Sequence, residues 1–307
     1  GIQFNPDVSM QDYPNDGLST GSVISYNISH DNHIGINTQG LVDCIISNNL
    51  IYNYTNNGLT FYHAESSGGV TNTKVYNNTI IANTLGRWSI FLANEVTNLI
   101  IYNNILINNT GGTGGAICFL DGSSQKTFTS NYNLVSDKFC DVDDGCSQTL
   151  AYWQGLGYDA NSVQAPALLT NLFVNPSGND YHLVTGSPAI NAGTNLVSPV
   201  VTQDLENMAR PAEGFYDIGC YEYNSTPVGI SIIQANEDNL NLIITSDLAY
   251  INDLQPTDQV MFLDLPGRMI FNGNYWNISK SSPGIYICRV LDKNGRIVGT
   301  RKFVLVH

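Results

Sequence analysis

The sequence of 307 residues predicts an all-β protein built from two different parts. Three observations lead to this fold class. Apolar stretches of three to five residues alternate with Asn and Gly, which is typical of short strands. A motif that contains Asn recurs through the first half of the chain. The polar segment 224–228 then separates this repeat from a C-terminal region of different charge, as a linker between domains does.

The recurring motif reads aliphatic, any residue, Asn or Tyr, Asn, any residue, aliphatic. It occurs at Ile24–Ile28, Ile46–Ile51, Val75–Ile80 and Ile101–Leu106, and in a weaker form at Phe128–Leu134. Its second Asn stands at positions 27, 49, 78 and 104. Three short strands per interval predict the coils of a parallel β-helix. We expect Asn at each corner because it tolerates left-handed backbone angles and because stacked amides bond along a ladder.

These repeats resemble those of the right-handed parallel β-helix family, the pectate-lyase-like superfamily. The resemblance implies a right-handed parallel β-helix over residues 1–223, with coils at about 21–148 and a closing segment at about 149–223. It says little about chemistry, because one fold supports many functions.

The closing segment resembles the choice-of-anchor module that ends many secreted β-helix proteins. The resemblance rests on Asp180–Leu183, Ser187–Gly193, Asp204, Arg210–Pro211 and Asp217–Glu222. The usual module has Asp and Ala where this chain has Asn191 and Cys220. The resemblance implies a cap on the last coil, since an open strand edge invites aggregation. We expect a buried Asp–Arg pair involving Asp204, Arg210 or Asp217 to lock the cap.

The C-terminal region, 229–307, holds six or seven short strands, and Pro266-Gly267 and Asn294-Gly295 mark hairpin turns. It therefore predicts a small Ig-like antiparallel β-sandwich. Leu263–Arg268, Ser282–Val290 and Gly295–Val306 resemble the type A C-terminal sorting domain of the type IX secretion system, although Pro266 replaces the more usual Leu or Thr. The residues that match the sorting signal are Gly267, Arg268, Pro283, Gly284, Tyr286, Gly295 and Lys302.

That resemblance implies export from a Gram-negative bacterium through the secretion machinery of its outer membrane. The protein would then be secreted or held at the cell surface, usually with the sorting domain removed. The alternative is an ordinary Ig-like accessory module. The chain begins at Gly1 without Met, so we expect a mature form or a fragment, and further coils before Gly1 are an open alternative.

Charge is distributed unevenly along the chain, whose net charge is −14. Residues 1–223 carry 19 acidic and five basic side chains, so all of the net charge lies there. This balance excludes nucleic acid as a partner, because phosphate recognition requires clustered Lys and Arg. No apolar run approaches the ~20 residues that a membrane helix needs. We expect a monomer.

The segment 137–146 holds four acidic residues and two Cys. Asp137, Asp141, Asp143 and Asp144 are hard oxygen ligands at a density that suits Ca²⁺, but the distal Glu of an EF-hand loop is missing. A solvated acidic loop is the alternative, and we expect no required cofactor. Cys140 and Cys146 are spaced to close a short disulfide loop in an oxidising compartment. Cys44 falls on an inward strand position and is expected in the core.

A candidate site follows from aligning the strand after three Asn corners, Leu59–His63, Ile90–Asn94 and Ile117–Asp121. This register places His63, Asn94 and Asp121 in one column, with Glu65 and Glu95 just beyond. The outer two members would lie about 10 Å apart, two strand spacings. His63, Asp121, Glu65 and Glu95 are the candidate catalytic residues, because paired carboxylates suit glycoside hydrolysis, and a His or Arg beside bound Ca²⁺ suits β-elimination. Tyr62, Arg87, Trp88 and Asn94 are the candidate glycan-binding residues.

Two functions therefore compete. The first is a surface protein whose β-helix binds a polysaccharide or surface glycan, or serves as a scaffold. The alternative is an extracellular polysaccharide lyase or glycoside hydrolase that acts in a groove of the β-helix. We favour binding, because a region with only five basic residues repels the acidic polymers that a lyase must attract.

Overall fold

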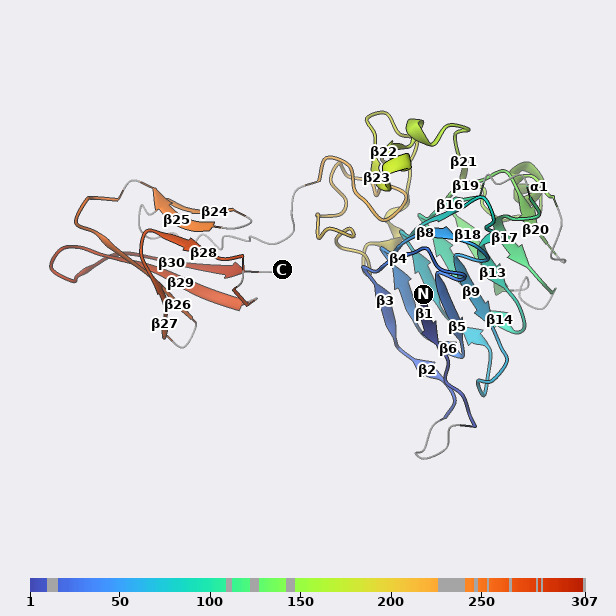
Figure 1. The fold of residues 1–307 in the computed structure, drawn as a ribbon, viewed down its shortest axis with the longest axis horizontal. Coiled ribbons are helices and arrows are strands. Elements are labelled where there is room, and N and C mark those ends of the chain that lie inside the picture. The colour runs from blue at the N-terminus through green and yellow to red at the C-terminus, as the bar shows by residue number, and fades with distance from the viewer. Residues whose placement is uncertain are drawn as a thin grey trace. The chain divides into compact units, whose positions relative to one another are not determined.

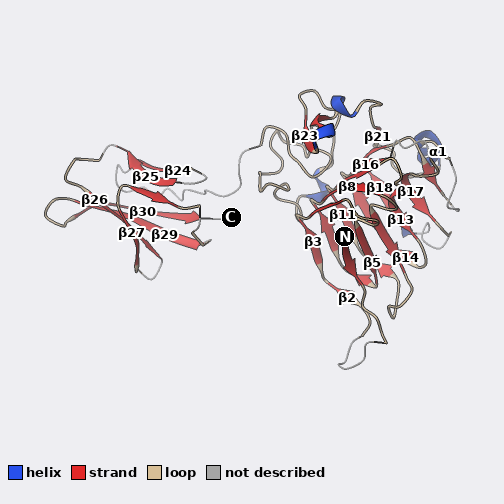
Figure 2. Ribbon diagram, in the orientation of Figure 1, coloured by secondary structure: helices blue, strands red, loops and turns tan. Residues whose placement is uncertain are grey.

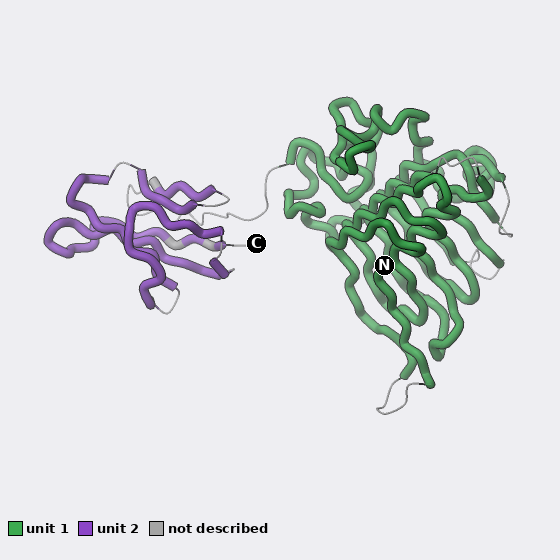
Figure 3. The backbone as a smooth tube through the Cα atoms, in the orientation of Figure 1, with its two compact units in different colours: residues 1–226 green, residues 227–307 purple. Residues whose placement is uncertain are grey.

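The structure, a computed structural model, describes residues 1–9, 16–108, 112–121, 127–141, 147–225, 241–245, 248–252, 254–264, 267–279, 281–282 and 284–305. The chain divides into two compact units, Gly1–Thr226 and Pro227–His307 (Figure 3). Strands dominate both units, as Figure 2 shows. Among the described residues, no helix has the length and apolarity to cross a membrane.

The first unit is a parallel β-helix made of four sheets, as the sequence predicted in outline (Figure 1). Sheet A contains β1 (Ile2–Phe4), β5 (Ile36–Gln39), β9 (Leu59–Tyr62), β13 (Trp88–Leu92), β17 (Gly115–Phe119) and β20 (Phe139–Cys140). Sheet B contains β2 (Ser19–Thr20), β6 (Leu41–Val42), β10 (Val70–Thr71) and β14 (Val96–Thr97).

Sheet C contains β3 (Val23–Ser25), β7 (Ile45–Ser47), β11 (Lys74–Tyr76), β15 (Ile100–Tyr102) and β18 (Thr129–Asn131). Sheet D contains β4 (Ile28–His30), β8 (Leu50–Tyr54), β12 (Thr79–Ala82), β16 (Ile105–Ile107), β19 (Leu134–Val135) and β21 (Val163–Gln164). The first four coils thus have four strands each, and the prediction of three was wrong. The strands of sheet B are two residues long, too short for alternation to reveal them.

The second Asn of each repeat forms a continuous ladder inside the β-helix. Each ladder amide donates a hydrogen bond of 2.9 Å from its Nδ2 to Oδ1 of the ladder residue in the next coil, in Asn27, Asn49 and Asn78 alike. Asn104 continues the ladder to Asn133 at 3.1 Å, in the weak fifth repeat. The predicted stacking of Asn residues is therefore confirmed. Each inner amide accepts through its oxygen from one neighbouring coil and donates through its N–H to the other, so the ladder fixes the coils in register.

The left-handed corner belongs to the residue before each ladder Asn. Tyr26, Asn48, Asn77, Asn103 and Tyr132 have φ between +51° and +59°. The repeat pattern predicted both roles for one Asn, and this part of the prediction was wrong. The two consecutive residues have different roles: the first adopts the left-handed angle and points outward, and the second points inward and joins the ladder.

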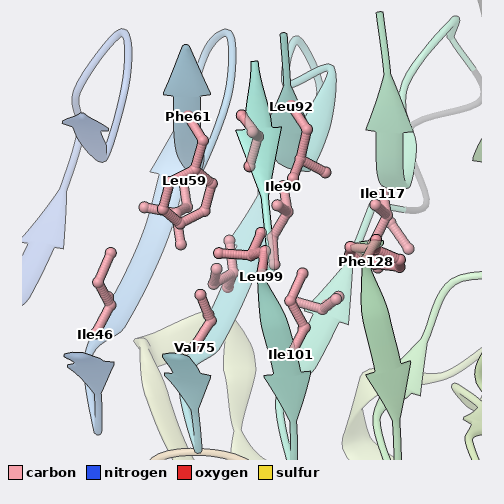
Figure 4. Close-up of a cluster of buried hydrophobic side chains, with 14 of the residues drawn as sticks. Ile46, Leu59, Phe61, Val75, Ile90, Leu92, Leu99, Ile101, Ile117 and Phe128 are labelled. Carbon is pink, nitrogen blue, oxygen red and sulfur yellow. The ribbon is translucent and has the colours of Figure 1, made fainter. Parts of the chain in front are cut away.

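The interior is a single apolar column that runs along the β-helix (Figure 4). Inward residues of sheets A and C, among them Phe61, Val75 and Ile90, are fully buried in it, and Cys44 lies there as predicted. Helix α1 (Leu150–Gly155) closes the column at the last coil. Its Trp153 stacks against Phe139, with ring centroids 4.7 Å apart.

Residues 169–223, here named the covering segment, lie along the side of the β-helix. The segment contains the 3-10 helices η2 (Leu169–Asn171), η3 (Pro176–Gly178) and η4 (Asn195–Val197), and the hairpin β22 (Phe173–Asn175) and β23 (Asp180–Leu183). Its apolar residues pack on the outer faces of sheets D and C. The predicted cap role therefore belongs to α1, and most of the closing segment instead covers two sheets.

The outward Asn residues hold the covering segment in place. The Nδ2 of Asn48 donates to the carbonyl of Gln203 at 2.9 Å, and that of Asn103 donates to the carbonyl of Thr194 at 3.0 Å. The Nδ2 of Asn77 donates to the backbone carbonyl of Asp217 at 2.9 Å. The three middle repeats therefore each supply one Asn for the interior and one for the cover.

A buried ion pair locks the covering segment, but its acid is not the predicted one. The Nη1 of Arg210 lies 3.4 Å from Oε2 of Glu222, and both side chains are almost fully buried. Asp204 and Asp217 accept backbone N–H groups instead, from Glu222 at 3.0 Å and from Asn191 at 2.7 Å. Burial raises the pKa of Glu222 to about 7, although the Arg210 charge opposes this shift.

The second unit is an antiparallel β-sandwich, as predicted. One sheet contains β24 (Asn241–Ile244), β25 (Leu248–Asn252) and β28 (Tyr275–Asn277). The other contains β27 (Met269–Asn272), β26 (Gln259–Asp264), β29 (Gly284–Leu291) and β30 (Ile297–Leu305). Residues of both sheets share one core, in which the rings of Phe262 and Trp276 lie 5.2 Å apart.

Candidate functional site

The strand register that defined the candidate column is confirmed to the residue. Leu92 on β13 pairs with Phe61 on β9 and with Phe119 on β17. Two residues beyond each of these, the chain reaches His63, Asn94 and Asp121. The backbone N–H of Asn94 donates to Oδ2 of Asp121 at 2.7 Å, and its Nδ2 donates to the carbonyl of His63 at 3.3 Å.

Two left-handed residues at the end of sheet A bring a carboxylate onto the column. Asn94 and Glu95 have φ of +55° and +59°. This turn directs Glu95 to His63, whose Nδ1 lies 2.8 Å from Oε2 of Glu95. The Nε2 of His63 lies 3.0 Å from the carbonyl oxygen of Ser66. A carboxylate and a carbonyl only accept hydrogen bonds, so each of these contacts holds the ring when the facing nitrogen carries a hydrogen.

Glu65 is held by two residues outside the predicted site, Asn5 and Gln39. Its Oε2 accepts from Nδ2 of Asn5 at 2.8 Å. Gln39, fully buried, accepts the backbone N–H groups of Ala64 and Glu65 at 3.1 and 2.9 Å through its Oε1. The register of β5 with β9 pairs Gln39 with Tyr62, which is the signal that could have located it. These bonds fix the turn that presents Glu65.

The predicted aromatic and cationic residues divide into two places. Tyr62 is half-buried, and its hydroxyl accepts from Nδ2 of Asn37 at 3.4 Å at the edge of the column. Trp88 is fully buried beside Cys118 and Cys140, so its ring offers no face to a sugar. Arg87 precedes β13, whereas the column follows that strand. The whole length of the strand therefore separates Arg87 from His63.

A hollow of about 470 Å³ lies over sheet B beside the column. Glu95 belongs to both, because its carboxylate holds His63 and the residue also lines the hollow. The hydroxyl of Thr97 donates to that of Thr71 at 3.0 Å on neighbouring strands. The other lining residues are Leu18, Val42, Gly68 and Gly69. The repeated Val-Thr pairs of β10 and β14 are the sequence signal that could have found this surface.

At one edge of the hollow, two backbone segments lie so close together that only glycine fits. A Cβ on Gly69 would lie 2.0 Å from the carbonyl oxygen of Glu95. A Cβ on Gly68 would meet only Leu18, at an ordinary 3.6 Å. Gly69 thus keeps two coils in close contact, whereas Gly68 leaves open space that a larger side chain would fill.

The predicted calcium ligands are only partly described. Oδ1 of Asp137 accepts the backbone N–H of Leu150 at 2.6 Å. The two carboxylate oxygens of Asp141 accept from Gln148 and from the hydroxyl of Tyr152, each at 3.0 Å. Asp143 and Asp144 lie outside the described residues. Within the described part of the chain, no three His, Cys, Asp or Glu side chains are grouped to hold a metal ion, and Ca²⁺ binding stays a prediction.

Cys140 is disulfide-bonded, and Cys146, its predicted partner, lies outside the described residues. In the second unit, Gly267 and Gly295 adopt φ of +89° and +74° at the predicted turns. Nε of Arg268 lies 2.6 Å from Oδ2 of Asp264. Among the other residues that match the sorting signal, Gly284 begins β29, Tyr286 lies in β29 and bonds the carbonyl of Ser282, Lys302 lies in β30, and Pro283 is outside the described residues.

Comparison with known proteins adds no relative to this description. No protein-family model, no curated protein and no solved structure matches the chain. The geometry of the column and the hollow, and the chemistry of the groups that line them, are therefore what bears on the function of the first unit.

Proposed function

We propose that the first unit is a noncatalytic, glycan-binding scaffold of a secreted or cell-surface protein. The observation that carries this proposal is the hollow of about 470 Å³ that adjoins the column of His63, Asn94 and Asp121. Its size lies in the range of pockets that hold small ligands. Hydroxyl groups and a carboxylate line it, and such groups bond the hydroxyls of a sugar.

The arrangement of the column favours binding over catalysis. Both nitrogens of His63 face acceptor groups of the protein, Oε2 of Glu95 and the carbonyl oxygen of Ser66, so the ring is engaged within the column and is not directed at a ligand. Asp121 accepts a backbone N–H and Glu65 accepts from two side-chain amides, so both carboxyl groups are likewise engaged by the protein. The column is therefore better suited to holding a fixed shape than to moving protons.

The charge of the unit points to an uncharged glycan. Residues 1–223 carry 19 acidic and five basic side chains, and Glu95 lies in the wall of the hollow. A polyuronide or sulfated polymer would be repelled by this field. A neutral sugar is not repelled, and its hydroxyls donate to Glu95 and bond the two Thr hydroxyls.

Filling the hollow tests this proposal. Gly68→Leu places a side chain in the open space, and Gly155→Leu, at a glycine whose Cβ would meet nothing within 4 Å, is the matched control. With an array of neutral and acidic oligosaccharides, we expect the wild type and the control to bind a neutral glycan and Gly68→Leu to bind it at least about tenfold more weakly. Equal binding by both variants would contradict the proposal.

The same panel tests the enzymatic alternative. Incubation with and without Ca²⁺, followed by assays for new reducing ends and for unsaturated-uronide absorbance, detects hydrolase and lyase activity. We expect no turnover. Turnover that disappears in His63→Ala or Asp121→Asn would instead assign the column to a polysaccharide lyase or glycoside hydrolase.

We further propose that residues 229–307 direct export by the type IX secretion machinery. The proposal rests on the resemblance of Leu263–Arg268, Ser282–Val290 and Gly295–Val306 to a type A sorting domain, and it is supported by the separation of this sandwich as its own compact unit. In a Gram-negative bacterium with this machinery, deletion of 227–307 should leave the protein inside the cell. Equal recovery of both forms from the medium and cell surface would overturn it.

A further inference from the structure

Two tyrosines form an exposed aromatic surface on the second unit. Tyr250 and Tyr275 lie directly opposite each other on the antiparallel strands β25 and β28. Their ring centroids are 5.3 Å apart, and the ring planes differ by 31°. Tyr275 is 64% exposed and Tyr250 is half-buried, while the adjacent residues Ala249 and Trp276 point into the core. Buried side chains on the inner face thus hold the two strands against the core, and the two tyrosine rings lie side by side on the outer face.

Uncharged groups, both polar and apolar, flank the rings. Ile243 lies opposite Tyr250, and Leu248, 37% exposed, lies opposite Asn277. Asn252 and Asn277 are exposed on the same face, because they alternate with buried residues. Oδ1 of Asn277 accepts from the backbone N–H and hydroxyl of Ser279 at 3.1 and 2.7 Å, which orients this amide and directs its Nδ2 away from that turn. The amide can therefore donate to a ligand that lies over the rings.

This sheet differs from the other sheet of the sandwich in charge. Strands β24, β25 and β28 contain no Asp, Glu, Lys, Arg or His. Strands β26, β29 and β30 carry Asp264, Arg289, Arg301 and Lys302. An ion or an anionic lipid surface would find no counter-charge on the first sheet, whereas a neutral ligand needs none.

We propose that this face, with Tyr250 and Tyr275 as its stacking platform, binds a neutral polysaccharide chain. A sugar ring presents C–H groups on its faces and hydroxyls at its rim, so it stacks on an aromatic ring while its rim bonds amides. Two adjacent rings extend the surface beyond one sugar. The site lies in the other unit from the hollow beside Glu95 and does not depend on it.

Depletion of the full-length chain by insoluble polysaccharides tests the site. Neutral cellulose, xylan and curdlan are compared with acidic alginate and with vesicles of phosphatidylcholine. The variants are Tyr250→Ala, Tyr275→Ala and Tyr275→Phe, and Phe215→Ala, which removes a 58% exposed ring from the first unit, is the matched control. Far-UV circular dichroism and melting temperature are recorded for each variant.

We expect the wild type, Phe215→Ala and Tyr275→Phe to bind at least one neutral polysaccharide. Each Tyr→Ala variant should bind about tenfold more weakly, as loss of a stacking platform predicts. Equal binding by both Tyr→Ala variants, failure to bind any neutral polysaccharide, or comparable capture by alginate or vesicles would overturn the proposal. Loss of binding in Gly68→Leu with no loss in the Tyr→Ala variants would assign the glycan to the hollow instead.

Discussion

The covered and open sides of the β-helix share one coil geometry but differ in what their strands present outward. Sheets C and D present apolar groups, such as Tyr76 and Ile105, and the covering segment buries them. Sheet B and the end of sheet A present Thr71, Thr97 and Glu95, which line an open hollow. The inner ladder of Asn supports both. The outward chemistry of each strand therefore decides which side becomes core and which side remains accessible to a ligand.

The largest effect is expected from breaking the lock on the covered side. Arg210→Met leaves Glu222 and the carbonyl oxygens at 217 and Gly219 buried without their donor, which should cost about 3–5 kcal/mol of unfolding free energy, since each unpaired group costs about 1–3 kcal/mol. Urea denaturation measures this loss, and hydrogen exchange should show faster exchange throughout the covering segment. The control is Arg268→Met, an 80% exposed Arg paired with Asp264, which should cost at most about 1 kcal/mol. A loss under about 1 kcal/mol for Arg210→Met would mean that the pair does not hold the cover.

A substitution in the inner ladder should weaken both sides together. Asn78→Ala removes a fully buried amide that bonds Asn104 and two backbone carbonyls and accepts from Asn49. The groups left unpaired should cost about 3 kcal/mol, since each contributes about 1–3 kcal/mol. Denaturation followed by tyrosine fluorescence measures it. Protection from hydrogen exchange should fall in strands of sheets A and D alike, and a fall confined to the covering segment would contradict the shared role.

The pH dependence of stability should come mainly from the covered side. Burial raises the pKa of Glu222 from its ordinary 4.5 to about 7, so the folded state binds a proton that the unfolded state releases. Stability from this group is full below pH 4.5 and is lost as pH rises to about 7, by about 3 kcal/mol. His182 acts in the same direction. Burial opposes its protonation, but hydrogen bonds to Asp180 and Glu206 outweigh burial and raise its pKa.

Melting temperatures measured from pH 4.5 to 8 test this sign. The wild type should become less stable as pH rises, and Glu222→Gln, which does not titrate, should flatten the profile. His182→Gln should flatten a further part of it at higher pH. A wild-type profile that rises from pH 4.5 to 7 would show that Glu222 is charged throughout this range in the folded protein.

The smallest effects separate the two sides most cleanly. Asn77 and Asn98 both adopt left-handed angles, so glycine preserves the backbone at either position. Asn77→Gly removes the buried bonds to the carbonyls at 217 and Gly219 of the covering segment, and the acceptor of Asn103, and should cost about 1–2 kcal/mol. Asn98→Gly removes only an exposed bond to Asn72 and should cost about 0.5 kcal/mol or less. Equal losses would show that the cover gains nothing from the outward Asn.

The candidate site shows how far strand register alone carries a prediction. Alternation and the Asn repeats placed His63, Asn94 and Asp121 together, because parallel strands of stacked coils stay in register over their whole length. The choice of Trp88 and Arg87 did not rest on register: Trp88 lies in a buried cluster, and Arg87 lies at the other end of β13 from the column. Register fixes which residues are neighbours along a column, but it does not tell which loops cover a strand or how a turn redirects the next side chain.

The sequence by itself determined the stacked coils, the ladder from Asn27 to Asn133 and the separate antiparallel sandwich. These features depend on local period and on repeats in which identical amides satisfy one another. Only the tertiary structure decided that residues 169–223 cover sheets C and D, that Arg210 pairs with Glu222, and that Glu95 turns back onto His63. Those contacts join segments whose partners are set by shape and burial across the fold, and no local pattern in the chain encodes that choice.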